Sequence, residues 1–154
     1  MARLLLLTAI LSALALACAG SAPAPTVPTD AALPGLDLAA ELARGEPVVL
    51  VWWLPWCESC AHEAPGLALA AKRFAGRLRF FGIVPGGEQD APQAEVEAFV
   101  LRHGIGYPTV RDRTGDFTRS FRVDGTPTIL VLDPSGEVRY RGSRAPDWNA
   151  LVGA

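Results

Sequence analysis

The stretch "VVLVWWL", residues 48–54, limits the possible folds of this chain more than any other. It contains seven consecutive apolar residues, most of them β-branched or aromatic. A strand with one solvated face alternates apolar and polar residues, whereas a strand covered on both faces is apolar throughout. The stretch therefore predicts a central strand, which needs a further layer of structure against each of its faces.

The segments that follow alternate between strand and helix patterns. A helix is predicted over residues 57–75, with a kink at Pro65 inside it. Two strands, 128–132 and 138–141, are joined by Pro-Ser-Gly, which is typical of a hairpin. The other expected elements are helices in "LDLAAELARGEP", "PQAEVEAFVLRHG", "TGDFTRSFRV" and "PDWNALV", and strands in "LRFFGIVP" and "YPTVRD". This order predicts an α/β fold with a mixed sheet in a three-layer sandwich.

The N-terminal segment, "MARLLLLTAILSALALACAG", predicts export. Arg3 precedes an apolar run over 4–17, and about 14 apolar residues are too few for a transmembrane helix, which needs about 20. Residues 1–17 are therefore predicted to be a signal peptide. The end of the run, "LALAC", resembles a bacterial lipobox in which Cys18 is lipidated. Ordinary cleavage after "ALA" and an uncleaved anchor remain alternatives, and all three export the domain.

Residues 18–35 predict a flexible tether, because they are rich in Ala, Pro, Ser and Thr and lack apolar periodicity. The remainder, 36–154, is long enough for one compact domain, which we expect to be monomeric. The formal net charge is −2 and no basic run is present in the sequence. Nucleic-acid binders usually cluster Lys and Arg on one face, so this class of function is not expected.

Cys57 and Cys60 carry the chemistry that the sequence predicts. They lie three residues apart at the start of the predicted helix, within reach of a disulfide. The unpaired N–H groups and dipole of a helix start stabilise a thiolate, so we expect a lowered pKa for the Cys57 thiol. Cys57 is thus the predicted nucleophile and Cys60 the resolving thiol. The carboxylate of Glu58 disfavours the thiolate form of Cys57. Because a destabilised thiolate gives up its electrons more readily, we expect a reductant rather than an oxidant.

A pair of cysteines three residues apart can also serve other purposes. A c-type haem site needs His directly after the second Cys, but Ala61 separates Cys60 from His62. A structural zinc site needs four ligands, and His62 with the distant His103 supplies no second pair. An alternative that stays open is that the protein is a lipoprotein without enzyme activity, which binds copper through the two thiols. An inert disulfide also stays open, although so short a loop constrains the unfolded chain little. We expect no cofactor and no metal.

The segments "WCESCAHEAP" and "VDGTPTILVLDPSGEV" resemble the thioredoxin superfamily, and more closely its TlpA/ResA-like branch of exported, membrane-tethered thiol–disulfide oxidoreductases. The resemblance covers residues 36–142. It implies a thioredoxin-like three-layer α/β/α sandwich whose mixed sheet ends in an antiparallel hairpin. It also implies that Pro127 is cis and faces the disulfide, leaving the backbone of Thr126 free to pair with a substrate strand.

The resemblance further assigns a proton relay. Val51 takes the place of the buried Asp of thioredoxin, and Glu63 takes the place of a Glu that lies under the cysteines in the tethered branch. A solvated position on the helix surface is the alternative for Glu63. The implied activity is reduction of disulfides in exported proteins, apocytochrome c being one candidate, on the periplasmic side of a membrane. The implied electron donor is a membrane thiol reductant.

Three tryptophans near the cysteines are sorted by strand alternation. Trp52 and Trp53 are neighbours on a strand, so they should enter the core on opposite faces of the sheet. Trp56 follows the strand and is expected to flank the reactive sulfur as part of a substrate platform. His62 is expected at the solvated surface. The same expectation applies to a mild basic cluster made of Arg111, Arg113, Arg119 and Arg122.

Overall fold

The structure is a computed structural model that describes residues 27–152. Its main sheet has five strands in the order β5-β4-β3-β6-β7. The strands are β3 (Val48–Trp52), β4 (Arg79–Pro85), β5 (Thr109–Asp112), β6 (Thr128–Leu132) and β7 (Val138–Gly142). Strands β3, β4 and β5 are parallel, whereas β6 runs antiparallel to β3 and β7 antiparallel to β6. The predicted mixed sheet with a closing hairpin is therefore confirmed.

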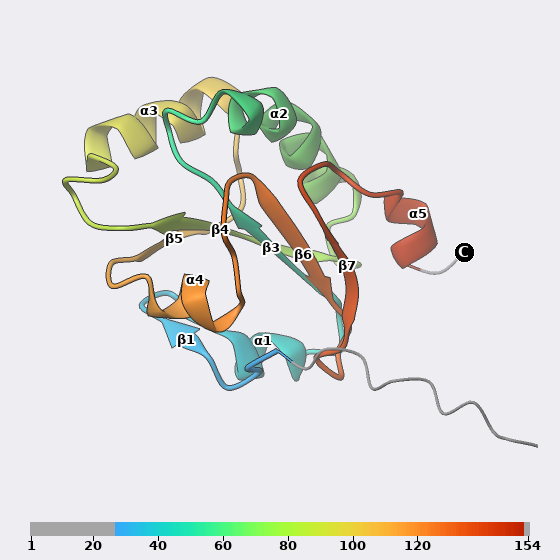
Figure 1. Cartoon of the computed structure of the whole chain (residues 1–154). Helices are drawn as coiled ribbons and strands as arrows, with labels where there is room; N and C mark the ends of the chain where they lie inside the picture. Colours follow the sequence, from blue (N-terminus) through green and yellow to red (C-terminus); the bar gives the residue numbers. More distant parts are fainter. Residues whose placement is uncertain (1–26, 153–154) are drawn as a thin grey trace, which may run out of the picture.

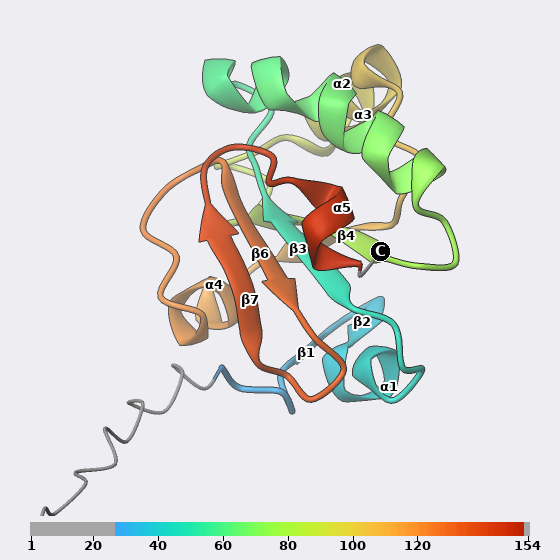
Figure 2. The same ribbon diagram turned by 90° about the vertical axis from the view of Figure 1, so that its right-hand side faces the viewer.

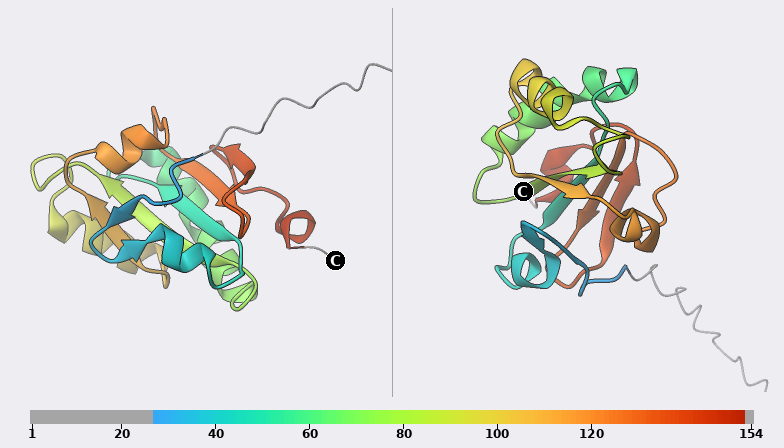
Figure 3. Two further views of the ribbon diagram at one scale, coloured as in Figure 1. Left: turned by 90° about the horizontal axis from the view of Figure 1, so that it is seen from below. Right: turned by 90° about the vertical axis from the view of Figure 1, so that its left-hand side faces the viewer.

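Helices cover both faces of the sheet, which gives the three predicted layers (Figure 1). One face carries α2 (Glu58–Arg73) and α3 (Gln93–His103), and the other carries α1 (Leu38–Leu42) and α4 (Asp116–Ser120). Figure 3, left, looks onto the face of α1 and α4. The two apolar clusters that fill these layers share β3, whose five residues are all buried. A strand apolar along its whole length is what this position requires.

The side chains of Trp52 and Trp53 enter different layers, as alternation predicts. Trp53 stacks on Phe99 of α3 with 4.5 Å between ring centroids. Trp52 lies on the other face, where its ring centroid is 5.5 Å from that of Phe121. Its indole N–H donates to the hydroxyl of Thr118 at 3.1 Å. These two rings fix the end of β3 from both sides, just before the chain reaches the cysteines.

Helix α2 begins where β3 ends and runs back across the sheet. Its buried positions recur at helical spacing and are Cys60, Ala64, Leu67, Ala68 and Ala70. The helix continues through Pro65, which is exposed. This amphipathic pattern sets which side of α2 faces β3, and it thereby sets the direction of the cysteine side chains at its first turn.

The folded part begins before the expected residue 36. Strand β1 (Ala32–Leu33) pairs with β2 (Leu36–Asp37), and Val27 and Leu33 pack against the apolar cluster on the α1 face. Part of the stretch assigned to the tether thus belongs to the domain. The predicted signal peptide, the rest of the tether and Cys18 lie outside the described residues. Within residues 27–152, every helix is too short or too polar to cross a membrane.

The C-terminal segment forms α5 (Trp148–Leu151), a single short helix. Figure 2 shows it below α2, on the same side of the sheet. The ring of Trp148 contacts that of Phe80 in β4, with centroids 5.2 Å apart. This short helix therefore covers the part of the face that α2 and α3 leave open.

Candidate active site

A disulfide joins Cys57 and Cys60 at the junction of β3 and α2, with 5.2 Å between the Cα atoms. Cys57 is the N-cap of α2, and its Sγ accepts a hydrogen bond from the N–H of Cys60 at 3.2 Å. The hydroxyl of Ser59 lies 3.6 Å from the same sulfur. A sulfur at a helix N-cap faces N–H groups that have no partner inside the helix. The surroundings of Cys57 therefore suit a thiolate once the disulfide is reduced.

The two sulfurs differ in access. Cys57 lines an open groove of about 690 Å³, together with Trp56, Thr126 and Pro127. Cys60 instead lines an internal cavity of about 10 Å³. The exposed fraction is 7% for Cys57 and 2% for Cys60. A partner disulfide approaching through the groove thus meets the sulfur of Cys57.

The opposite wall of the groove is the start of β6. The Thr126–Pro127 peptide bond is cis, as the resemblance implied. The carbonyl oxygen of Thr126 is 3.5 Å from Cys57 Sγ. Thr128 pairs with Trp52 in the sheet, so this segment is held at the end of β3 next to the disulfide.

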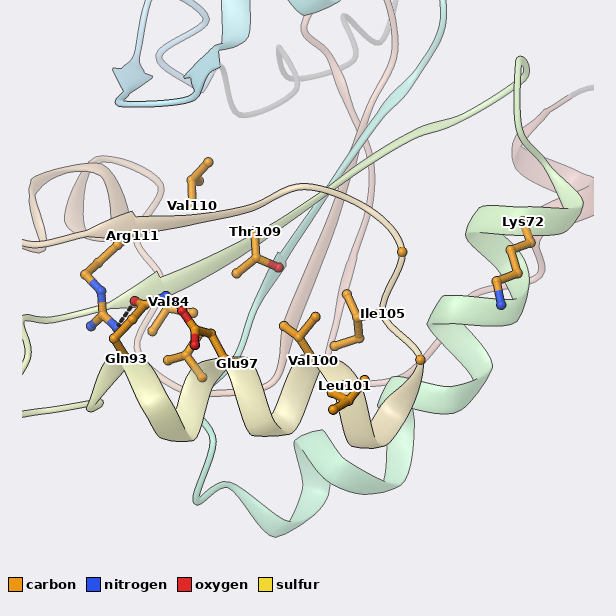
Figure 4. A pocket seen from close by; sticks show the side chains of 13 residues that line it. Lys72, Val84, Gln93, Glu97, Val100, Leu101, Ile105, Thr109, Val110 and Arg111 are labelled. Atoms are coloured by element: carbon orange, nitrogen blue, oxygen red, sulfur yellow. Dashed lines mark hydrogen bonds between the residues drawn. The ribbon is translucent and has the colours of Figure 1, made fainter.

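Trp56 forms an exposed platform at the edge of the groove, with 65% of its surface accessible. Its indole N–H donates to the carbonyl of Asp90 at 3.1 Å. The Asp90 carboxylate accepts from the N–H of Gly87 at 2.8 Å, which closes the loop after β4. Arg111 donates to the carbonyl of Gly87 at 3.0 Å and to the side chain of Gln93 at 3.1 Å (Figure 4). Hydrogen bonds thus link Trp56 to Arg111 through the loop after β4.

The expectation that Arg111 is a solvated surface residue is wrong. It is half-buried, because its guanidinium satisfies carbonyl groups of the loop after β4. Arg113, Arg119 and Arg122 are exposed, as predicted, and Arg119 pairs with Asp116. No local pattern distinguishes Arg111 from these three, since its partners lie 18 to 25 residues away in the chain.

Glu63 lies in the wall of the groove that Cys57 borders. It is half-buried, and its Oε2 accepts a hydrogen bond from the N–H of Ala145 at 3.1 Å. Ala64 takes the buried position beside Cys60. The cavity behind Cys60 has no carboxylate among its described lining residues, which include Val51. Glu63 therefore faces the same groove as Cys57. His62, exposed as expected, lines it too.

A segment that the sequence analysis missed completes the groove. Ser143 and Arg144, directly after β7, line it opposite the start of α2. The hydroxyl of Tyr140 donates to the carbonyl of Arg144 at 2.7 Å. The one local indication of this arrangement in the sequence is Gly142, because a Cβ atom at that position would collide with the Tyr140 hydroxyl. Glu63 and Tyr140 together hold this wall in place.

The groups that line the cavity behind Cys60 are apolar or neutral. Tyr107 lines the cavity behind Cys60, and burial raises the pKa of its hydroxyl, so the phenol stays protonated. Within residues 27–152, no three His, Cys, Asp or Glu side chains lie close enough together to hold a metal ion. A second hollow, about 530 Å³, lies between α3 and β5 (Figure 4). Its lining is mostly apolar and contains no cysteine or histidine.

Comparison with known proteins identifies a family and several named relatives. The model of the AhpC/TSA family matches residues 21–141. The thiol-disulfide oxidoreductase ResA of Geobacillus kaustophilus is 31% identical over 96 residues, which cover 62% of this chain and 53% of ResA. The soluble secreted antigen MPT53 of Mycobacterium tuberculosis is 27% identical over 108 residues, which cover 70% of this chain and 60% of MPT53. The chain thus spans about half to three fifths of these relatives.

A solved structure supports the fold. A secreted Mycobacterium tuberculosis disulfide oxidoreductase, described as homologous to E. coli DsbE, matches with a TM-score of 0.60 and 24% identity. The match covers 73% of this chain and 77% of that chain. The predicted thioredoxin-like α/β fold is therefore confirmed, and with the ResA match so is the resemblance to the TlpA/ResA-like branch.

Proposed function

The chain belongs to the AhpC/TSA family, and from this membership we propose that it is an exported thiol–disulfide oxidoreductase that reduces disulfides in other exported proteins. The observation that carries the proposal is the access of Cys57. Its sulfur borders an open groove beside Thr126 and Pro127, while Cys60 is enclosed. A nucleophile that can be reached and a resolving thiol behind it are what dithiol exchange requires.

The proposed reaction starts from the reduced pair. The Cys57 thiolate attacks one sulfur of the substrate disulfide, forming a mixed disulfide and releasing the other substrate sulfur as a thiolate. The Cys60 thiolate then attacks Cys57, forming the Cys57–Cys60 disulfide and releasing the second substrate sulfur. Two electrons and two protons pass to the substrate in total, and the disulfide form of the enzyme is the product state.

Four residues besides the cysteines have proposed roles. Glu63 borders the groove with Cys57 and is placed to exchange protons with the sulfurs that react there. The backbone of Thr126 pairs with an extended substrate segment, in the manner of strand addition, and Pro127 shapes the docking surface. The exposed ring of Trp56 supplies apolar contact area beside the disulfide.

The cellular setting is proposed from the sequence and from relatives. Cleavage after the signal peptide and lipidation of Cys18 would place the domain, as a monomer, on the periplasmic side of a membrane. The name of MPT53, a secreted antigen, is consistent with export. A membrane thiol reductant returns two electrons to Cys57–Cys60 after each turnover. Apocytochrome c is one proposed substrate among exported proteins.

Trapping of the mixed disulfide tests the proposed function. In Cys60→Ser the resolving thiol is gone, so a partner attacked by Cys57 stays covalently attached. We expect Cys60→Ser to accumulate adducts on non-reducing gels that disappear on reduction, and mass spectrometry to identify the partners. The matched variant Cys57→Ser should form none, because Cys60 is enclosed. Equal trapping by both variants would reverse or remove the assigned roles.

A further inference from the structure

Arg144 lies in the groove of Cys57 and has no role in the steps above. It follows β7, is exposed, and lines the groove together with Cys57 and Thr126. Its backbone is fixed on both sides, by the bond from the Tyr140 hydroxyl to its carbonyl and by the bond from Ala145 N–H to Glu63. The side chain therefore projects from a held segment.

The charge of Arg144 is uncompensated. Across residues 27–152 its guanidinium has neither an ion-pair nor a hydrogen-bond partner. By contrast, Arg79 pairs with Glu41 and Arg139 with Asp133. An arginine presents five donors in a planar fork that suits a carboxylate.

Two carboxylates, those of Glu63 and Glu58, line the same groove, and neither forms an ion pair within residues 27–152. Glu63 accepts a backbone N–H from Ala145. Glu58 lies in the first turn of α2, where the positive end of the helix dipole stabilises an anion. Among the described residues that line the groove, Arg144 is the one side chain with a permanent positive charge, and it is free to pair with a carboxylate of a substrate.

We propose that Arg144 makes the enzyme prefer substrates that carry an acidic side chain within a few residues of the disulfide. The inference rests on the proposed function and adds a substrate class to it. A substrate segment paired with Thr126 places its cysteine at Cys57 and its neighbouring side chains along the groove, where Arg144 binds a carboxylate. Because the contact is exposed, it acts through association more than through the exchange steps.

Peptide selectivity tests this inference with the purified full chain. The substrates are disulfide-bonded peptides with blocked termini that differ at one position beside the cysteine, Glu in one and Lys in the other. For wild type we expect kcat/KM to favour the Glu peptide by about five-fold at low salt, and the preference to fade with added salt. Arg144→Gln should bring the ratio near one, and Arg144→Glu should invert it.

Two matched variants complete the design. Arg113→Gln removes an exposed arginine outside the groove and should keep the wild-type ratio. Arg144→Lys keeps the charge without the fork and should retain part of the preference. An unchanged ratio in Arg144→Gln and Arg144→Glu would overturn the inference while leaving the reductase activity in place. If wild type reduces neither peptide, the proposed function itself fails.

Discussion

Cys57 and Cys60 occupy different environments although one helical turn separates them. Cys57 is the N-cap of α2 and borders the groove, with the Ser59 hydroxyl 3.6 Å from its sulfur. Cys60 points toward β3 and a small apolar cavity. This asymmetry arises because Cys60 lies on the side of α2 that packs against the sheet, whereas Cys57 is the N-cap that precedes the first turn. A spacing of three residues thus separates an accessible sulfur from a protected one.

Glu63 permits a test that separates proton transfer from support of the groove wall. Glu63→Gln keeps a side-chain oxygen that can accept from Ala145 N–H, but it removes the titratable group. If Glu63 moves protons, we expect kcat to fall by about ten-fold or more and the pH profile of kcat to change shape. Stopped-flow rates of peptide disulfide reduction across pH would measure this.

Glu63→Ala is the matched comparison, since it removes both the proton carrier and the acceptor for Ala145. We expect it to lose the preference for acidic peptides as well, because the segment that carries Arg144 loses one of its two supports. Wild-type rates and pH profile in Glu63→Gln would exclude Glu63 from proton transfer and leave it with the structural role alone.

At the scale of elements, the loop between β4 and α3 connects the sheet to the substrate platform. Arg111 in β5 donates to the carbonyls of Gly86 and Gly87, and Asp90 of the same loop accepts from Trp56. The ring of Trp56 is thus held by a strand two positions away from β3 in the sheet. The loop behaves as a support for the groove and not as a simple connection.

Arg111→Gln tests this support. Loss of the bonds to the two carbonyls should loosen the loop and let Trp56 move, so we expect KM for peptide disulfides to rise several-fold with a smaller change in kcat. The Trp56→Phe variant keeps an aromatic ring but cannot donate a hydrogen bond to the Asp90 carbonyl. It should likewise raise KM several-fold with a smaller change in kcat. An unchanged KM in both variants would mean that substrates do not use the platform.

The elements and the cysteine site were predictable from the sequence because their signals are local. The apolar run of β3, the periodic burial along α2 and the turn of the final hairpin each depend on neighbouring residues. The roles of Arg111 and Arg144 were not predictable, because each depends on segments brought together by the fold. The wall formed by Glu63 and Ala145 joins residues 82 positions apart.

At the scale of the molecule, the proposed lipid anchor gives the domain its location. Cys18→Ser removes the sulfur that would be lipidated but keeps every described residue. We expect the wild-type chain in the membrane fraction of the producing cells and the variant in the soluble exported fraction, with equal reductase activity once purified. Membrane association of both forms would favour an uncleaved anchor, and release of both would favour ordinary cleavage.

The position of Thr29 adds an orientation to this picture. Thr29 lies against Gly136, in the turn between β6 and β7, whereas Thr126 and Cys57 lie beyond the other end of β6 (Figure 1). A chain anchored at Cys18 would therefore be attached, through the predicted tether, near the end of the sheet opposite the reactive sulfur. Substrates in the aqueous space would approach directly. An electron donor embedded in the same bilayer would then meet Cys57 when the domain turns on that tether, or when the donor's dithiol projects past the domain.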